Sequence, residues 1–516
     1  MAQGTGDFLR LFGVVPQVRH AGLFAQVSDL GFELFNADDG TDVRKGGAKS
    51  RNVFGEIEFV HIGSKLIVAP WSQWVADHPS FTGAEGAREP GYRYRMPAEQ
   101  PFRWGSIALP ALLPTVIFST GEGAIIPIIP IAADNLGASL AIAGLVAALL
   151  TLGELFGNIP SGWLIARIGE RPAMIGAAST SIVGLVICLI APFPAALGFG
   201  VLLIGLSAAV FALARHAFLT SFVPLPYRAR ALSTLGGTFR LGYFVGPFIS
   251  VAVIHLTGSV SAVFWIHVVA CLSTAIILIA LPDPEKTFGS VATVRLGGRE
   301  LREGEAQVEE ERVGLWRIIH ANRGVLTRLG VGAALIGALR ASRQVMLPLW
   351  AVSIAVSDAN TALIIGIAGA VDFALFYASG QIMDRFGRLW SALPSMIGLG
   401  IGFLTLAFTH DLPTNLVWFI GVAMFLSLAN GIGSGILMTL GADLANPNNP
   451  APFLGAWRFT GNLGGAGAPL LIVALTAAAS IAVAAGVMGV LGLIGAGVLL
   501  RYIPRYIPKQ RRPRAR

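Results

Sequence analysis

The chain has 516 residues, of which 54% are hydrophobic and 13% charged, and its mean hydropathy is +0.69. Soluble domains carry about 25% charged residues, so this composition excludes a soluble globular protein and predicts a polytopic membrane protein. The net charge of +8 comes from short loops and a basic C-terminal tail, 506–516, which indicates anionic lipid rather than nucleic acid as the partner of the positive charge.

Residues 1–103 differ in composition from the rest of the chain, because they mix charged, glycine and aromatic residues. The stretch 53–60 alternates apolar and polar side chains, which predicts one or two strands. The start has no basic segment leading into an apolar core, so we expect no signal peptide. Three interpretations of 1–103 remain open: a small cytoplasmic domain, a disordered extension, or a start assigned too far upstream.

From about residue 104 the chain contains twelve apolar stretches, each near the roughly 20 residues that cross a bilayer core. Their predicted cores are 106–130, 139–164, 172–192, 195–222, 231–255, 259–281, 325–352, 361–383, 390–409, 414–440, 453–477 and 479–502. One long charged loop, 282–322, separates them into two groups of six. We therefore predict an all-α membrane protein with a six-helix N-terminal half, 104–281, and a six-helix C-terminal half, 323–505.

The distribution of basic residues predicts the orientation. Arginines occur in the loops after the second, fourth and eighth stretches, at Arg167 and Arg171, Arg228 and Arg230, and Arg385 and Arg388. The loops after the odd-numbered stretches contain no Lys or Arg. Because Lys and Arg are retained on the cytoplasmic side, we predict a plasma-membrane protein with both termini in the cytoplasm.

The loop after the eighth stretch reads Gly-Gln-Ile-Met-Asp-Arg-Phe-Gly-Arg at 380–388. This pattern resembles the signature of major facilitator superfamily transporters, Gly-x-Leu-x-Asp-Arg-x-Gly-Arg, with Ile382 in place of Leu. The resemblance covers about 104–505 and implies two pseudo-symmetric six-helix halves that work by alternating access. It also implies a gating role for the cytoplasmic loop that contains Gly380, Asp384, Arg385, Gly387 and Arg388.

The loop after the second stretch is the counterpart in the first half, with Gly162, Arg167, Gly169 and Arg171. It departs from the family pattern, since Ala166 stands where an aspartate is usual and Glu170 where an arginine is common. The family's aspartate role is therefore expected only of Asp384.

Aligning the two loops places Glu154 on Asp372, which indicates that the two halves are repeats of each other. Two further registers support the repeat. One places Glu122 on Arg343, and the other places Arg240 within one residue of Arg458.

The fifth stretch contains Gly-Tyr-Phe-Val-Gly-Pro at 242–247, which resembles the Gly-x-x-x-Gly-Pro motif of proton-coupled antiporters. Gly242 and Gly246 would let two helices touch, and Pro247 would bend the helix. The glycine pair that usually follows is replaced by Ser250 and Val251, so the match is partial. Ordinary helix packing is the alternative interpretation.

Several ionisable side chains lie inside the apolar stretches, where each costs roughly 2.5–3.5 kcal/mol on insertion scales and usually faces the bundle interior. They are Glu122, Glu154, Arg215, Arg240, Arg340, Arg343, Asp372 and Arg458. All of these except Arg215 are our candidates for a proton or substrate cavity. Glu122 is either a proton site or the partner of Arg343 or Arg340. Glu154 and Asp372 either take part in transport or pair with Arg240 or Arg458, and Arg215 either matches a family arginine or extends to the surface.

We expect a secondary transporter, and proton-coupled export of a small, partly apolar compound is the preferred version. The alternative is a proton-linked uptake symporter for a sugar or an organic anion, which the arginines would suit. A third possibility is a non-transporting sensor that uses 1–103. Only scattered histidines are present, and no nucleotide-binding motif, so we expect neither an enzyme nor ATP-driven transport. The expected partners are the substrate, protons and lipid, without nucleic acid, metal or cofactor, and the expected functional unit is a monomer.

Overall fold

The computed structural model describes residues 50–52, 55–57, 59–62, 65–68, 108–223, 225–281, 293–296, 299–303, 305–306, 315–445 and 451–507. The chain divides into two units, Met1–Glu99 and Gln100–Arg516. In the first unit, β1 (Ser50–Asn52) pairs with β2 (Gly55–Ile57), and β3 (Phe59–Ile62) pairs with β4 (Lys65–Val68), both antiparallel. Strands β2 and β3 lie in the stretch whose alternation predicts strands.

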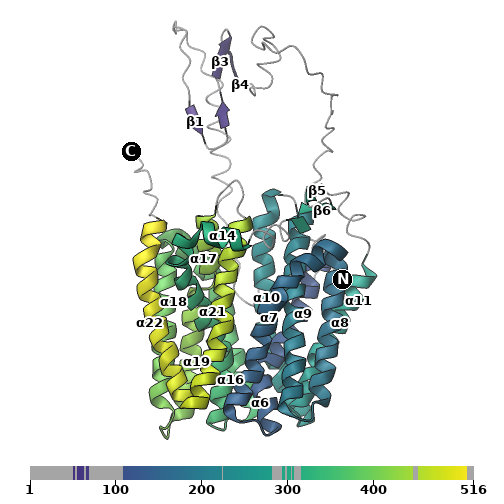
Figure 1. Ribbon diagram of the computed structural model, residues 1–516, viewed down its shortest axis with the longest axis vertical. Coiled ribbons are helices and arrows are strands. Elements are labelled where there is room, and N and C mark those ends of the chain that lie inside the picture. Colours follow the sequence, from purple (N-terminus) through teal and green to yellow (C-terminus); the bar gives the residue numbers. More distant parts are fainter. Residues whose placement is uncertain are drawn as a thin grey trace, which may run out of the picture. The chain divides into compact units, whose positions relative to one another are not determined.

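The second unit is a bundle of long helices (Figure 1). The helices of its first half are η2 (Ala108–Leu112), α5 (Leu113–Ile125), η3 (Ile126–Ile128), α6 (Ile129–Asn135), α7 (Leu140–Ile168), α8 (Glu170–Ile190), α9 (Pro194–Phe222), α10 (Leu225–Thr257), η4 (Ser261–Val263) and α11 (Phe264–Ala280). Those of its second half are α16 (Leu329–Ser353), α17 (Asp358–Phe386), α18 (Leu389–Thr409), α19 (Asn415–Ile432), α20 (Ile436–Leu444), α21 (Ala451–Ala478) and α22 (Ile481–Tyr506).

Within the described residues, eleven helical segments are long and apolar enough to cross a membrane. The predicted seventh span, α16, is also long, at 25 residues, but it contains Arg340, Arg343 and Gln344. These polar side chains lower its hydropathy, and a helix with such residues must face the protein interior rather than lipid. The predicted all-α membrane fold is confirmed.

Two predicted spans are interrupted rather than continuous. The first passes from α5 through the short 3-10 helix η3 into α6, where Pro127 and Pro130 remove backbone N–H donors. The tenth breaks between α19 and α20 at 433–435, which reads Gly-Ser-Gly. Glycine is unfavourable in a helix interior, so this sequence favours a turn there.

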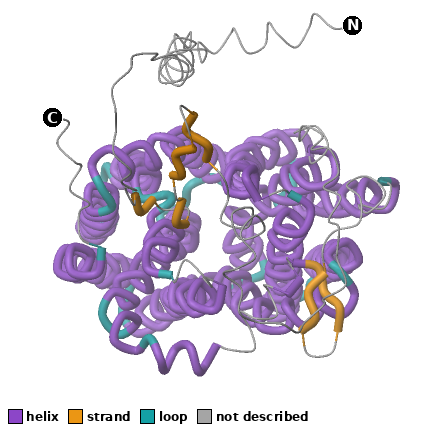
Figure 2. The backbone as a smooth tube through the Cα atoms, turned by 90° about the horizontal axis from the view of Figure 1, so that it is seen from above, coloured by secondary structure: helices purple, strands orange, loops and turns teal. Residues whose placement is uncertain are grey.

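The two halves repeat the same packing. Helix α5 packs against α10 and α11, as α16 packs against α21 and α22, while α7 packs against α9 as α17 packs against α19. The halves meet through α10 with α17 and through α7 with α21. Viewed from above, the helices form two neighbouring groups (Figure 2). This arrangement places η3, α6, α7 and α10 of the first half against α16, α17 and α21 of the second half.

The loop between the halves contributes three described pieces. They are the hairpin of β5 (Thr293–Leu296) with β6 (Arg299–Arg302), residues 303 and 305–306, and the short helices α14 (Leu315–Ala321) and α15 (Arg323–Leu326). Leu301 and Glu305 are buried, although they belong to a charged loop. This part of the loop is therefore packed against the helical bundle.

Candidate transport site

Glu122 lies on α5 inside the first half and is only 2% exposed. Its Oε2 accepts a hydrogen bond from the Tyr243 hydroxyl at 3.1 Å, and its Oε1 is buried without a hydrogen-bond partner. No cation forms an ion pair with Glu122 in the described part of the chain. The pairing of Glu122 with Arg343 or Arg340, which the sequence left open, is not present in this structure.

Glycines bring Tyr243 next to Glu122. A Cβ added to Gly242 would lie 2.6 Å from the carbonyl carbon of Ser119, and one on Gly246 would lie 2.5 Å from the carbonyl oxygen of Thr120. A Cβ added to Gly123 would lie 2.7 Å from the Cα of Tyr243. Backbone contacts this close require glycine, so the motif at 242–247 joins α10 to α5 at the level of Glu122.

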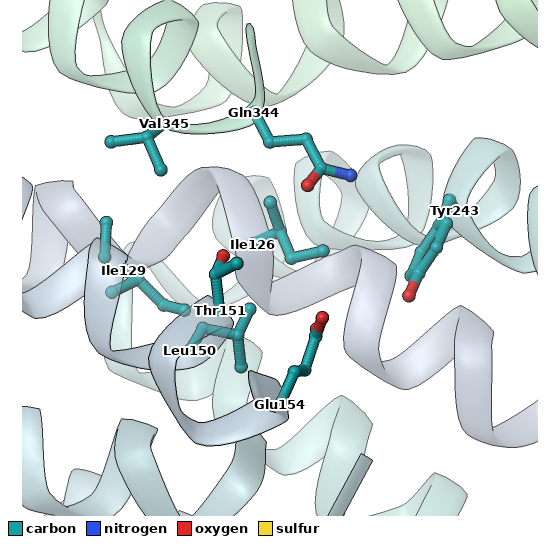
Figure 3. Close-up of a pocket in the computed structure, with 9 residues that line it drawn as sticks. Ile126, Ile129, Leu150, Thr151, Glu154, Tyr243, Gln344 and Val345 are labelled. Atoms are coloured by element: carbon teal, nitrogen blue, oxygen red, sulfur yellow. The ribbon is translucent and has the colours of Figure 1, made fainter. Parts of the chain in front are cut away.

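Glu154, on α7, lines a cavity together with Tyr243. The cavity contains about 500 Å³ of empty space, including the solvent at its mouth. Figure 3 shows the Glu154 carboxylate and the Tyr243 hydroxyl pointing into the same space, with Gln344 on the opposite side. The remaining lining residues are Ile126, Ile129, Ala147, Leu150, Thr151 and Val345. Since Gln344 and Val345 belong to α16, the cavity lies between the halves.

Glu122 and Glu154 lie close enough to interact electrostatically. Among the residues that the structure describes, Glu154 likewise forms no ion pair with a cation. Glu122 is buried and Glu154 is half-buried, and two neighbouring carboxyl groups without a cation cannot both stay ionised there without a large cost. The arrangement can therefore hold a proton.

A second polar cluster is centred on Asp372 of α17. Its carboxylate forms ion pairs with Arg240 at 3.5 Å and with Arg343 at 3.4 Å, and the Asn430 amide donates to both carboxylate oxygens at 3.0 Å. Arg343 also donates to the Ser427 hydroxyl at 2.8 Å. Arg240 belongs to the first half and the other four residues to the second. The pairing of Asp372 with Arg240, one of the alternatives left by the sequence, is thus present and joins the halves.

Arg340 lies beside this cluster and donates a hydrogen bond to the carbonyl of Gly433. That carbonyl belongs to the break between α19 and α20, and Arg240 binds the next carbonyl, of Ser434, at 3.5 Å. The interruption of the tenth span therefore supplies two backbone acceptors to arginines. Arg458, the remaining candidate, lies on α21, near enough to His216 of α9 to interact with it electrostatically.

Arg215 on α9 is fully buried, so it does not extend to the membrane surface. It donates to the carbonyl of Ala111 and, at 3.4 Å, to the sulfur of Met174, and its guanidinium stacks on the Phe211 ring at 4.7 Å. These contacts all lie within the first half. Arg215 therefore connects α9 with η2 and α8, and it makes none of these contacts with the Glu122 or Asp372 clusters.

The loops that contain Gly169 and Gly387 differ between the halves. In the second half, Arg388 forms ion pairs with Asp384 at 3.3 Å and with Asp443 of α20 at 2.7 Å, while Asp384 is largely exposed. In the first half, Arg171 donates to the carbonyls of Leu278, Ile279 and Leu281 at the end of α11. Both loops turn at a glycine with positive φ, 84° at Gly169 and 97° at Gly387, and such a φ favours glycine.

The remaining loop candidates contribute no contact between the halves in the described residues. Arg167 stacks on Trp163 at 5.1 Å and Arg385 on Phe386 at 5.4 Å, each within its own helix end. A Cβ added to Gly380 would meet nothing within 4 Å. Asp384 thus pairs inside its own loop, and it is Arg388 that connects this loop to another helix.

The family model of the Major Facilitator Superfamily matches residues 111–469 and 344–516. The chain belongs to the major facilitator superfamily. It is therefore an integral, multi-pass membrane protein of a family of small-molecule transporters, and the resemblance noted from the loop at 380–388 is confirmed. No curated protein sequence matches the chain.

Several solved structures of superfamily transporters share its fold. The xylose transporter XylE from E. coli has 14% identity and a TM-score of 0.59, over 78% of this chain and 99% of that one. The human organic anion transporter MFSD10 has 16% identity and a TM-score of 0.55, over 78% and 100%. A POT family transporter in complex with a thioalcohol-conjugated peptide has 12% identity and a TM-score of 0.63, over 78% and 96%. At these identities the likeness concerns the fold alone.

The first-half loop departs from the superfamily pattern at Glu170, and the structure supplies a reason. Glu170 is buried, accepts a hydrogen bond from Ser221 at 2.7 Å and pairs with Arg302 of the central loop at 2.8 Å. Arg302 also pairs with Glu305 at 3.5 Å and stacks on Phe222 at 5.3 Å. A carboxylate in place of the usual arginine thus binds an arginine that comes from the loop between the halves.

Several polar partners in this superfamily member were not predicted. Tyr243 was part of the predicted motif, but not as a hydrogen-bond donor. Asn430 and Ser427 lie on the buried side of α19, and Arg302 lies in the central loop. Asn430 had a usable signal, because an amide within a long apolar stretch usually needs a polar partner. The others had none, because serine and tyrosine are common in such helices.

Proposed function

We propose that this chain is a proton-coupled secondary transporter that exports a small molecule across the plasma membrane by alternating access of its two halves. The observation that carries the proposal is the Glu122 carboxyl group, which is buried, has Tyr243 as its hydrogen-bond donor and lies near Glu154. Both termini are proposed to be cytoplasmic and the working unit a monomer. The position of the arginines in even-numbered loops supports this orientation.

The physical basis of the coupling is the cost of an unpaired buried carboxylate. The titratable groups that interact with Glu122 in the described residues are Tyr243 of α10, Glu154 of α7 and Cys271 of α11, none of which is a cation. His267 of α11 packs against Gly121, the residue next to Glu122, and its Nε2 is hydrogen-bonded with the Ser181 hydroxyl at 3.2 Å. Holding a proton removes the cost of an isolated charge, and contact with water restores the preference for the ionised form. Glu154 lines a cavity whose opposite wall is α16, so a movement between the halves would change the hydration of the carboxyl pair.

The motif at 242–247 supports export over uptake, because it resembles the motif of proton-coupled antiporters and its glycines place Tyr243 against Glu122. The second candidate function is proton-linked uptake of a sugar or an organic anion. The cluster of Arg240, Arg340 and Arg343 favours an anion within that candidate. Transport in either direction would distinguish both from a non-transporting sensor.

The test uses the purified chain in proteoliposomes, with a panel of small molecules followed with and without an imposed pH gradient. Transport should be directed by the gradient in the wild type. The Glu122→Gln side chain is always uncharged, like a protonated glutamate. This variant should reduce gradient-driven transport at least about tenfold, but it should still exchange substrate when the pH is equal on both sides. Asp411→Asn, at a carboxylate that is 96% exposed between α18 and α19, is the control and should behave as the wild type.

Two results would contradict the proposal. Glu122→Gln with the wild-type dependence on the gradient would place the proton site elsewhere, and Glu154 would be examined next. A wild type that moves no compound of the panel in either direction, while remaining folded, would favour the sensor.

A further inference from the structure

The cluster around Asp372 contains more positive than negative charge. Three arginines converge there, Arg240, Arg340 and Arg343, and the only carboxylate that pairs with them in the described residues is Asp372. Arg240 and Arg343 share that single carboxylate at 3.5 and 3.4 Å, whereas Arg340 reaches only a backbone carbonyl. Buried charges are normally neutralised by partners, so the cluster has unused capacity for an anion.

Unused hydrogen-bond donors occur in the same place. The Nε atoms of Arg340 and Arg343 are buried and have no hydrogen-bond partner. An unmade hydrogen bond of a buried polar group costs free energy, so two such donors on neighbouring arginines need an explanation. A ligand that brings acceptor oxygens would satisfy them.

The cluster is also within reach of solvent. Solvent can reach part of three of its side chains, since the exposed fraction is 23% for Arg240, 15% for Asp372 and 13% for Arg343. An aromatic ring lies beside it, because the Arg240 guanidinium stacks on Phe376 at 4.7 Å. Phe373, which follows Asp372 in the chain, stacks on Phe244 of the other half at 5.8 Å. An apolar or aromatic body would have a surface to contact next to the charged groups.

We propose that this cluster binds the carboxylate group of an organic anion with an apolar or aromatic body, and that this anion is the transported substrate. The planar guanidinium fork matches a carboxylate. Asp372 occupies the arginines in the structure and acts as an internal competitor that the substrate displaces. Arg240 comes from one half, and Arg340 and Arg343 come from the other. A bound substrate would therefore replace the ion pair that joins the halves with contacts from its own carboxylate to the arginines. This inference rests on the proposed transport function but not on Glu122.

The test is the thermal stabilisation of the purified full-length chain by matched pairs of probes. The pairs are benzoate and benzamide, phenylacetate and phenylacetamide, and hydrocinnamate and hydrocinnamamide. At least one carboxylate should raise the unfolding temperature with a saturable dose dependence, and its amide should not. In Arg343→Gln the apparent affinity should fall about tenfold or more, since a charge-assisted hydrogen bond is lost.

Asp372→Asn separates a binding site from a purely structural ion pair. It removes the competing carboxylate, so the same anion should bind about three- to tenfold more tightly. Arg343→Lys keeps the charge and should bind with intermediate affinity, which guards against a folding defect in Arg343→Gln. The control is Arg328→Gln. Arg328 is exposed, lies outside the cluster and donates a hydrogen bond to the Tyr506 hydroxyl, so its replacement should leave the affinity for the anion unchanged.

Three outcomes would overturn the inference. No carboxylate of the panel stabilises the protein, the amides stabilise it as much as the carboxylates, or Asp372→Asn lowers the affinity for the anion. Glu122→Gln distinguishes this failure from failure of the proton site. If the Glu122→Gln variant still binds carboxylates in preference to amides and its transport still depends on pH, the anion site is supported and the proton site is contradicted.

Discussion

Asp372 accepts hydrogen bonds from three side chains, Arg240, Arg343 and Asn430, whereas Glu122 accepts one from Tyr243 among the described residues. Asp372 therefore has two cationic partners, while Glu122 has none among the described residues. The two carboxyl groups, on α5 and α17, thus have opposite surroundings. This difference is the reason why we propose proton exchange for Glu122 and substrate competition for Asp372.

Glu305 is a titratable residue outside the membrane whose protonation should control the docking of the central loop. It is 7% exposed, and burial followed by the nearby Glu170 raises the pKa of Glu305 to about 7. Because this pKa lies above the ordinary value of 4.5, the protonated form favours docking. Docking is strongest below about pH 4.5 and weakens as the pH rises through about 7.

Hydrogen exchange of 299–306, corrected for the intrinsic rate, should therefore show about tenfold or greater loss of protection from about pH 5 to about pH 8. Glu305→Gln stays neutral and should keep its protection over the same range. Equal protection at both pH values in the wild type would contradict this assignment.

At the scale of helices, the contact of α5 with α10 depends on glycine. A Cβ added to Gly246 would meet the backbone of α5, including the Thr120 carbonyl oxygen at 2.5 Å and the carbonyl carbon of Gly123 at 2.6 Å. Backbone cannot move aside as a side chain does. Gly246→Ala should therefore destabilise the protein by about 1–3 kcal/mol and separate Tyr243 from Glu122.

The matched control is Gly237→Ala on the same helix, where an added Cβ would meet only the Phe376 ring at an ordinary 3.9 Å. Thermal unfolding in detergent and gradient-driven transport should both fall for Gly246→Ala and stay near the wild type for Gly237→Ala. If the two variants lose stability equally, close helix contact is not the role of the motif.

At the scale of the whole molecule, the orientation in the membrane can be tested with single cysteines. Asn360 and Thr414 are exposed at the starts of α17 and α19, and Arg323 is exposed on α15 at the other end of the bundle. The native Cys188 and Cys271 are buried, so they give little background. An impermeant maleimide should label Asn360→Cys and Thr414→Cys in intact cells, but Arg323→Cys only after permeabilisation. Labelling of Arg323→Cys in intact cells would reverse the orientation.

The local sequence was enough to predict twelve spans, eleven of which are long and apolar enough in the described residues, as well as the two halves and the family. These properties follow from the local run of apolar residues that a bilayer requires, and from one loop signature. It also indicated which ionisable residues are buried, because a charge inside an apolar stretch is unusual wherever it occurs. Even α16 was recognised, although its arginines lower its hydropathy.

The partners of those charges depend on how the helices pack in three dimensions. Asp372 pairs with Arg240, which lies 132 residues away in the chain, and Glu122 receives its hydrogen bond from Tyr243 rather than from Arg343. Glu170 binds Arg302 of a loop that showed no motif. Which side chains meet depends on how each helix is rotated and on how closely its glycines let it approach a neighbour, and these are properties of the packed helices rather than of any one span.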